Sequence, residues 1–181
     1  INAYKSVYDQ YEQQQKNVQS QIDQQVADLR RQEEANKKND PSYDAGKDNG
    51  ATGSMMWPCP SCHTITSEFG WRYHPIYHTQ KYHSGVDIGA SYGASIVAAD
   101  GGTVITAGAV SGYGNCVVIN HGNGITTLYG HMSSIAVSSG QKVSKGQTIG
   151  YVGSTGNSTG PHLHWEVTVN GVRQNPLNYA R

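Results

Sequence analysis

The residues of this 181-residue chain best suited to chemistry are histidines that recur at strand spacing, one of them beside an aspartate. His83 and Asp87 lie four positions apart with Gly85 between them, and His162 and His164 lie two positions apart. Because side chains alternate along a strand, each set places its members on one face. Imidazole and carboxylate groups are zinc ligands, and a catalytic zinc site keeps one position open for water. The spacing predicts a zinc site with two histidines and one aspartate, and it leaves open whether His162 or His164 binds.

A third element has the same spacing. Tyr129 and His131 flank Gly130, and alternation predicts that both side chains lie on one strand face. The remaining histidines lack this pattern, and we expect them at ordinary hydrogen-bonded surface or core positions: His63, His74, His78 and His121.

The elements that position these residues are predicted to be strands. Residues 57–181 contain short runs rich in Val, Ile, Thr and Tyr, separated by glycine-containing turns. Asn123-Gly124 and Asn170-Gly171 mark hairpin turns, because Asn and Gly readily adopt positive φ. This part of the chain is therefore expected to be mainly β, an antiparallel β-sandwich. The predicted strands are Ser95–Ala99, Gly102–Ala107, Cys116–Asn120, Ile125–Tyr129, Thr148–Val152 and His162–Val169.

The first 38 residues have a different composition. All 22 glycines lie from Gly46 onward, whereas nine glutamines lie between Gln10 and Gln32. Apolar and aromatic residues recur there at alternating steps of three and four, which is the heptad pattern. We expect a helical coiled-coil segment over residues 1–38, either the end of a longer coiled coil or an amphipathic helix packed on the β domain. The heptad seam comprises Tyr4, Tyr8, Tyr11, Gln15, Val18, Ile22, Gln25 and Leu29.

Residues 39–56 are predicted to be a flexible linker. Pro41 disfavours helix in the residue before it. Residues 46–56 are rich in Gly, Asp, Asn, Ser and Thr, and they offer few groups to bury. Three domains are therefore expected: residues 1–38, 39–56 and 57–181.

Composition argues against two classes of protein. Thirteen basic residues balance thirteen acidic ones, whereas a nucleic-acid-binding domain usually has a basic excess, so no nucleic-acid partner is expected. The longest apolar runs are only a few residues, far short of a membrane span. The chain begins with Ile1 rather than Met, as expected of a fragment or a processed form.

Several segments of the β domain, taken in order, resemble the lysostaphin/LytM-type zinc metallopeptidases that cut peptidoglycan peptides. The resemblance covers about residues 66–176 and implies the lysostaphin-like fold, an antiparallel sandwich of the duplicated hybrid motif type. The segments that carry it are Phe69–Arg72, His83–Asp87, Ala98–Val104, Tyr113–Asn115, Leu128–Ser133 and Gly153–His164.

The resemblance also assigns roles to the candidate residues. The family pattern makes His83, Asp87 and His164 the ligands of a Zn²⁺ ion, with His131 and His162 as the catalytic pair. Such an ion activates water and polarises the scissile carbonyl. One histidine of the pair would take and return a proton while either, if charged, stabilises the oxyanion. The sequence does not say which one is the general base.

The resulting expectation is a zinc-dependent endopeptidase acting on peptidoglycan, outside the cell or at the bacterial cell surface. The alternative is a non-catalytic binding module of a cell-wall, division or sporulation complex, since some family members have lost ligands. Here all five positions are filled, which favours the enzyme. The coiled-coil segment offers a site for a protein partner or for self-association.

Glu166 bears on which bond is cleaved. Lysostaphin-like glycyl-glycine peptidases tend to carry Gln at this position, so we expect cleavage of stem-peptide cross-links rather than glycine bridges. A carboxylate there would suit an amine-bearing substrate group, or it could simply orient a ligand, because it shares the strand face of His162 and His164.

Two other features leave alternatives open. Cys59 and Cys62 are expected to form a tight disulfide or to be two plain thiols, rather than half of a zinc knuckle, and Cys116 is expected to be a small packed residue. The segment Tyr73–Tyr82 lines a substrate groove or is a polar surface loop.

Overall fold

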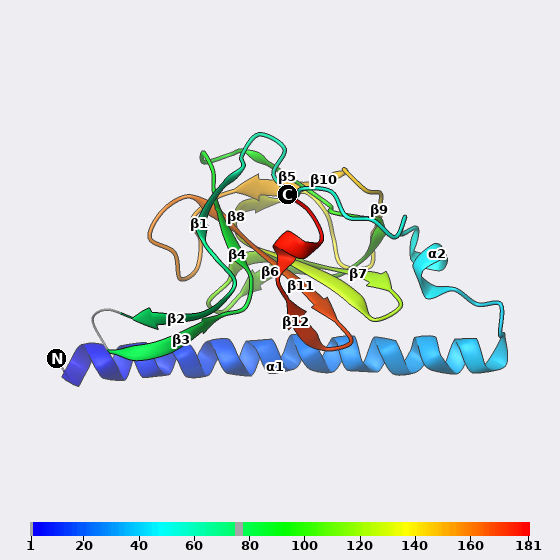
Figure 1. The fold of residues 1–181 in the computed structure, drawn as a ribbon, viewed down its shortest axis with the longest axis horizontal. Coiled ribbons are helices and arrows are strands. Elements are labelled where there is room, and N and C mark those ends of the chain that lie inside the picture. The colour runs from blue at the N-terminus through cyan, green and yellow to red at the C-terminus, as the bar shows by residue number, and fades with distance from the viewer. Residues whose placement is uncertain (1, 75–77) are drawn as a thin grey trace.

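The computed structural model describes residues 2–74 and 78–181 (Figure 1). A long helix, α1 (Asn2–Asn39), and a short one, α2 (Ala45–Asn49), precede the strands. Among the described residues, no helix is both long and apolar enough to cross a membrane. The other elements are β1 (Thr64–Ser67), β2 (Gly70–His74), β3 (Thr79–His83), β4 (Val86–Gly89), β5 (Ser95–Val97), β6 (Gly102–Val110), β7 (Gly114–Gly122), β8 (Ile125–Ile135), β9 (Lys142–Val143), β10 (Thr148–Val152), β11 (His162–Val169), β12 (Val172–Gln174) and the 3₁₀ turn η1 (Pro176–Asn178).

The strands confirm the predicted β architecture. Ten of them form one antiparallel sheet in the order β1-β4-β11-β8-β7-β6-β9, with β5, β10 and β12 paired at its side, and β2 and β3 form a separate hairpin. Asn123 and Asn170 have φ of 53° and 52°, as the two predicted hairpin turns require.

The main hydrophobic core lies between the layers of this folded sheet. Val86, Ile88, Leu163 and Trp165 are fully buried in it. They alternate along β4 and β11 with the candidate site residues, as the sequence predicted. The two central strands therefore have one apolar face and one polar face, and the polar face carries the candidate site.

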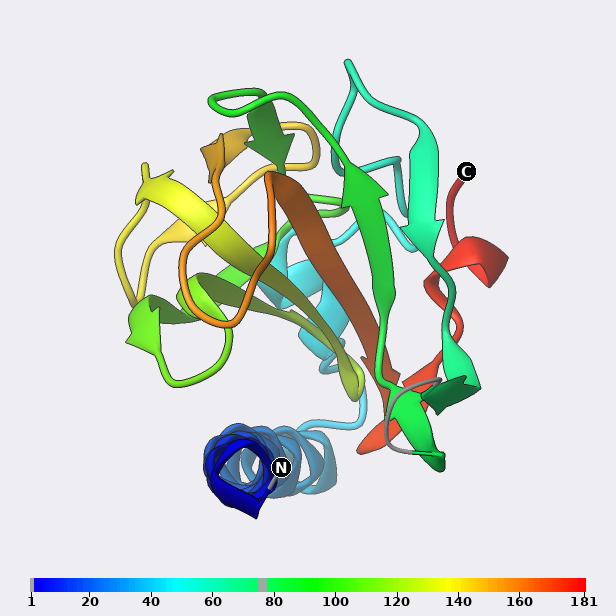
Figure 2. The ribbon, with the colours of Figure 1, turned by 90° about the vertical axis from the view of Figure 1, so that its left-hand side faces the viewer.

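Helix α1 packs against the β domain rather than standing free (Figures 1 and 2). Ile22 and Val26, one turn apart, are buried in a second apolar cluster with Tyr113, Cys116, Val118 and Leu128. Ile22 and Val26, together with the partly buried Val18, are spaced four residues apart along the helix. Val26 is not one of the predicted heptad positions, so α1 packs through a different stripe from the predicted seam. Of the two alternatives that the heptad pattern allowed, the structure has the packed helix. Half of the predicted seam, Tyr4, Tyr8, Tyr11 and Gln15, has side chains outside the described residues.

The segment between α1 and the strands has more fixed structure than its composition predicts. Asp44 caps α2 by accepting hydrogen bonds from the amides of Gly46 and Lys47. The buried carboxylate of Asp100 accepts hydrogen bonds from the backbone N–H groups of Thr52 and Gly53. The predicted linker at residues 39–56 is thus tied to the β domain, because a distant carboxylate satisfies its polar backbone.

Candidate active site

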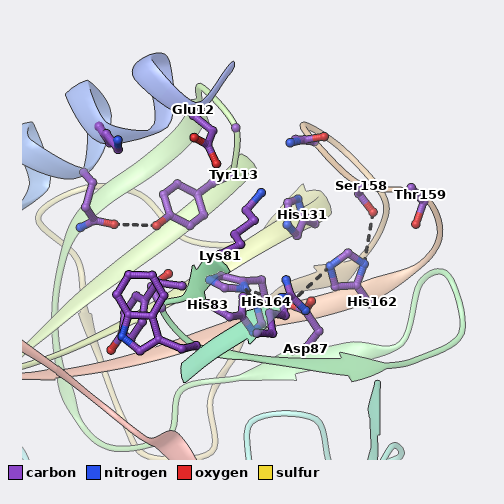
Figure 3. Close-up of a pocket in the computed structure, with 18 of the residues that line it drawn as sticks. Glu12, Lys81, His83, Asp87, Tyr113, His131, Ser158, Thr159, His162 and His164 are labelled. Atoms are coloured by element: carbon purple, nitrogen blue, oxygen red, sulfur yellow. Dashed lines mark hydrogen bonds and ion pairs between the residues drawn. The ribbon is translucent and has the colours of Figure 1, made fainter. Parts of the chain in front are cut away.

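Three side chains from three strands converge on one point of the polar face (Figure 3). Register pairs His164 on β11 with Asp87 on β4, and their Nδ1 and Oδ1 atoms lie 2.8 Å apart. His83, at the end of β3, places its Nε2 atom 3.3 Å from each of these two atoms. The structure therefore brings together the three residues that the family pattern assigns to a metal.

The turn between β3 and β4 depends on a glycine. A Cβ atom on Gly85 would lie 2.3 Å from the backbone oxygen of Trp165, so no larger residue fits without moving β11. Gly85 thereby allows β4 to lie close enough to β11 for Asp87 and His164 to meet.

A backbone oxygen orients the imidazole of His83, and the carboxylate of Glu166 orients that of His164. His83 Nδ1 lies 2.8 Å from the carbonyl oxygen of Glu68, so it donates there and its Nε2 atom faces the cluster. His164 Nε2 lies 2.9 Å from Glu166 Oε1, and its Nδ1 atom faces the cluster. Each imidazole therefore presents one defined nitrogen to the same point.

Glu166 orients a ligand and does not face the substrate. Its carboxylate is buried and accepts hydrogen bonds from Ser84, Tyr113 and Arg173 in addition to its contact with His164. Burial alone raises the pKa of Glu166, but the His164 and Arg173 charges lower it to about 2. The suggestion that Glu166 meets an amine of the substrate is therefore wrong, because its oxygens are already occupied inside the protein.

The donor set fits a zinc ion. Ligands 2.0–2.1 Å from a tetrahedral metal lie about 3.3 Å from one another, and two of the three separations are 3.3 Å. The surroundings also favour a cation: burial alone lowers the pKa of His164, but Asp87 and Glu166 raise it to about 9. Burial alone would raise the pKa of Asp87, but its contacts with the imidazoles of His164 and His83 hold that pKa well below its usual range.

His131 and His162 form a second pair beside this cluster. Their ring centroids lie 4.6 Å apart, and His162 Nε2 lies 3.7 Å from Asp87 Oδ1. His131 Nδ1 donates to the carbonyl oxygen of Thr155, and His162 Nδ1 donates to that of Gly160, both at 2.8 Å. These bonds leave the Nε2 atom of each ring with a lone pair. Burial, and then the neighbouring histidines, lower the pKa of His131 to about 4, so it is neutral at pH 7.

The backbone at His131 differs from the prediction. Tyr129 points into the core, where its hydroxyl accepts a hydrogen bond from the backbone N–H of Ala99. Strict alternation would send His131 to the core as well. Its φ of 61° instead turns the side chain to the polar face, and its N–H donates to the carbonyl oxygen of Tyr113 at 2.6 Å. The prediction that Tyr129 and His131 share a face is wrong because it assumes a regular strand.

The cluster and the pair lie in an open groove of about 570 Å³. One wall is the β2–β3 hairpin, which contributes part of the predicted Tyr73–Tyr82 segment, although residues 75–77 lie outside the described chain. Another wall comes from α1 through Glu12, Lys16 and Gln19, a contribution that sequence reasoning missed. Helical spacing placed Glu12, Lys16 and Gln19 on one face, but nothing local showed that this face met the groove.

The remaining candidates lie elsewhere. His121 is buried between the carbonyl of Gly101 and the hydroxyl of Thr127, and His63 stacks on Trp57. His78 contacts Tyr73, and the side chain of His74 lies outside the described residues. The three cysteines are free thiols, and Cys116 is a packed residue of the cluster under α1. The positions of His63, His78 and His121 agree with ordinary structural roles, and the expectation for His74 stays a prediction.

Comparison with protein families decides the identity of this domain. The model of peptidase family M23 matches residues 81–176, which is more than half of the chain and includes every candidate site residue. This chain belongs to peptidase family M23. The resemblance stated from the motifs is thereby confirmed.

Characterised relatives include both peptidases and an activator. The chain is 47% identical over 116 residues to the DD-carboxypeptidase/endopeptidase Mpg of Neisseria meningitidis, a match covering 64% of this chain and 27% of that protein. It is 40% identical to the peptidoglycan DD-endopeptidase ShyA of Vibrio cholerae, over 75% of this chain and 32% of ShyA. It is also 36% identical to the murein hydrolase activator NlpD of Salmonella dublin, over 68% of this chain and 31% of NlpD. In each case the aligned part of this chain spans about a third or less of the relative's length.

Solved structures agree on the fold. A zinc-containing peptidase from Vibrio cholerae superposes with a TM-score of 0.64 at 35% identity, over 67% of this chain and 38% of that one. The catalytic domain of lysostaphin from Staphylococcus simulans gives a TM-score of 0.59 at 32% identity, over 65% of this chain and 91% of that domain. The β domain therefore has the lysostaphin-type fold.

Proposed function

We propose that this M23 domain is a zinc-dependent endopeptidase of peptidoglycan, with His83, Asp87 and His164 as the metal ligands. The observation that carries the proposal is the convergence of one donor atom from each residue, all within 4.8 Å, on the floor of an open groove. A zinc ion bound there would supply the Lewis acidity that activates water and polarises a peptide carbonyl.

The two other histidines supply the proton chemistry. His131 is neutral and has a lone pair on Nε2, so it is able to accept a proton from the attacking water. His162 also has its proton on Nδ1, and its Nε2 atom lies 3.7 Å from Asp87 Oδ1, so it is placed to share the proton and, once protonated, to stabilise negative charge on the substrate oxygen. The backbone carbonyls of Thr155 and Gly160 hold both rings in these orientations.

We propose stem-peptide cross-links as the substrate and the bacterial cell envelope as the site of action. Mpg and ShyA support this choice, since Mpg is named a DD-carboxypeptidase/endopeptidase and ShyA a peptidoglycan DD-endopeptidase. Glu166 supports it only through the sequence comparison with glycyl-glycine peptidases, because the buried carboxylate does not reach the groove.

The second candidate is a non-catalytic activator. It is favoured by the likeness to NlpD and by α1, which forms a wall of the groove and could be exchanged for a partner. The filled ligand set and the oriented histidine pair favour the enzyme instead, because an activator has no need of either.

The test combines metal analysis with hydrolysis. The purified chain is expected to bind one zinc ion per molecule, and His164→Ala is expected to lose both the metal and the release of new amino termini from purified peptidoglycan. Zinc retained at full occupancy in His164→Ala would show that the ligand assignment is wrong. Full zinc binding by the wild-type chain without hydrolysis would favour the activator.

A further inference from the structure

Two cations face each other across the β2–β3 hairpin beside the candidate metal cluster. Register places Arg72 directly opposite Lys81, so their side chains leave the hairpin on the same face, and both line the groove. Like charges directly opposite in a sheet are destabilising unless an anion lies between them. The Arg72 guanidinium donates to the hydroxyl of Ser67, a neutral partner that leaves its charge in place.

Strand β3 fixes the position of Lys81, and of Arg72 opposite it, relative to the metal cluster. Lys81 lies two residues before His83 and therefore shares its face. Two residues of strand span roughly 6.6 Å, which is also the reach of two residues in an extended peptide. An anion bound by Arg72 and Lys81 would therefore belong to a substrate residue one or two positions from the scissile peptide bond.

In the structure, a carboxylate from α1 faces this pair. Glu12 lines the same groove, and Figure 3 shows its side chain on the helix above Lys81. The rest of α1 packs through Ile22 and Val26, so Glu12 is held at the groove by contacts far from it.

We propose that Arg72 and Lys81 form a subsite for a free carboxylate of the peptide substrate, and that Glu12, on the α1 wall of the same groove, competes with that carboxylate for the two cations. The inference rests on the proposed peptidase function and adds the charge of the substrate group. A guanidinium and an ammonium suit a carboxylate, because charge-assisted hydrogen bonds are stronger than neutral ones and Arg offers a planar fork of donors. Binding of that carboxylate would therefore be opposed by the negative charge of Glu12 on the facing wall.

The test compares two synthetic cross-linked stem peptides with the zinc-loaded full chain. The peptides differ only at one carboxylate next to the scissile bond, which is free in one and amidated in the other. The wild type is expected to have a kcat/KM about tenfold or more higher for the free acid, the value of one charged hydrogen bond. Lys81→Gln is expected to bring this ratio close to one, and Lys81→Arg to restore most of it.

An equal acid-to-amide ratio in the wild type and in Lys81→Gln would overturn the subsite. Failure of the proposed function looks different, since then neither peptide is cut by any variant and no ratio exists. Lys81→Arg guards against a folding defect, because it keeps the charge at the same position.

The role of Glu12 has its own control on the same helix. Glu12→Gln is expected to lower KM for the free acid several-fold and to change KM for the amide much less. Glu34→Gln makes the same charge change about 33 Å further along α1, at a side chain that is 74% exposed. This control variant is expected to have the wild-type KM for both peptides. The same KM for the free acid in Glu12→Gln and Glu34→Gln would overturn the competition by Glu12.

Discussion

The docking of α1 makes a prediction whose size follows from the buried groups. Ile22 and Val26 are 7% and 4% exposed in the cluster under the helix. Changing both to Ala removes five buried carbon atoms, which at about 0.8 kcal/mol for each costs about 4 kcal/mol of docking free energy. Remaining contacts such as Tyr113 to Gln19 and Arg173 to Asp23 are each worth about 1–3 kcal/mol. Because those contacts remain in the double variant, the change is expected to raise the undocked fraction of α1 about 10³-fold, as a loss of about 4 kcal/mol implies.

Hydrogen exchange followed by mass spectrometry measures this undocking. Peptides from residues 2–39 are expected to exchange much faster in the double variant, while strands β7 and β8 stay protected. Val7→Ala is the matched control, because Val7 is on the same helix and 49% exposed, and it is expected to change stability by less than about 0.5 kcal/mol. Undocking also removes one wall of the groove, so a peptide substrate is expected to be cleaved faster. Unchanged exchange of α1 in the double variant would refute the account of the docking.

Three further results are expected. Glu166→Ala removes a buried carboxylate that pairs with the mostly buried guanidinium of Arg173, which keeps Asp23 as its other partner, so urea unfolding should show a loss of about 3 kcal/mol, and Glu166→Gln a smaller loss. His131→Ala should keep its zinc in metal analysis and lose turnover by about 10²-fold, and loss of the metal instead would make it a ligand. Burial lowers the pKa of His121 below its usual 6.5, so the unfolded state binds the extra proton and stability falls as the pH drops below 6.5. The unfolding free energy of His121→Gln should therefore vary less steeply with pH between about 6.5 and 5.5 than that of the wild type, by up to about 1.4 kcal/mol per pH unit.

The strands were predictable because their signals are local. The predicted bounds of β10 and β11 agree with the structure to the residue, since alternating apolar positions end there at glycine-containing turns. The metal cluster was predictable only in part. Alternation along a single strand predicted that His83 and Asp87 share a face, whereas a turn separates them at the end of β3 and on β4, and His164 lies on β11. Placing the two segments side by side required the family resemblance, because register between distant strands has no local signal.

Other features depend on contacts that the sequence does not record. The positive φ of His131 accompanies hydrogen bonds from its N–H to the carbonyl of Tyr113 and from its Nδ1 to that of Thr155, and an ordinary strand pattern gives no sign of it. The partners of Glu166 include residues as distant in sequence as Ser84 and Tyr113. The heptad pattern predicted a helix correctly but did not identify its buried stripe, because a helix packed on a sheet need not use the seam that a coiled coil uses.

The central claim is that the cluster of His83, Asp87 and His164 binds zinc and makes the chain a peptidoglycan peptidase. The most direct measurement is mass spectrometry of fragments released from purified peptidoglycan by the zinc-loaded chain, by the chelated chain and by the Ile22→Ala/Val26→Ala variant. New amino termini are expected from the zinc-loaded chain, in larger amount from the variant whose α1 undocks more often, and not after chelation. A folded, zinc-loaded protein that releases no new amino termini, even in that variant, would contradict the account.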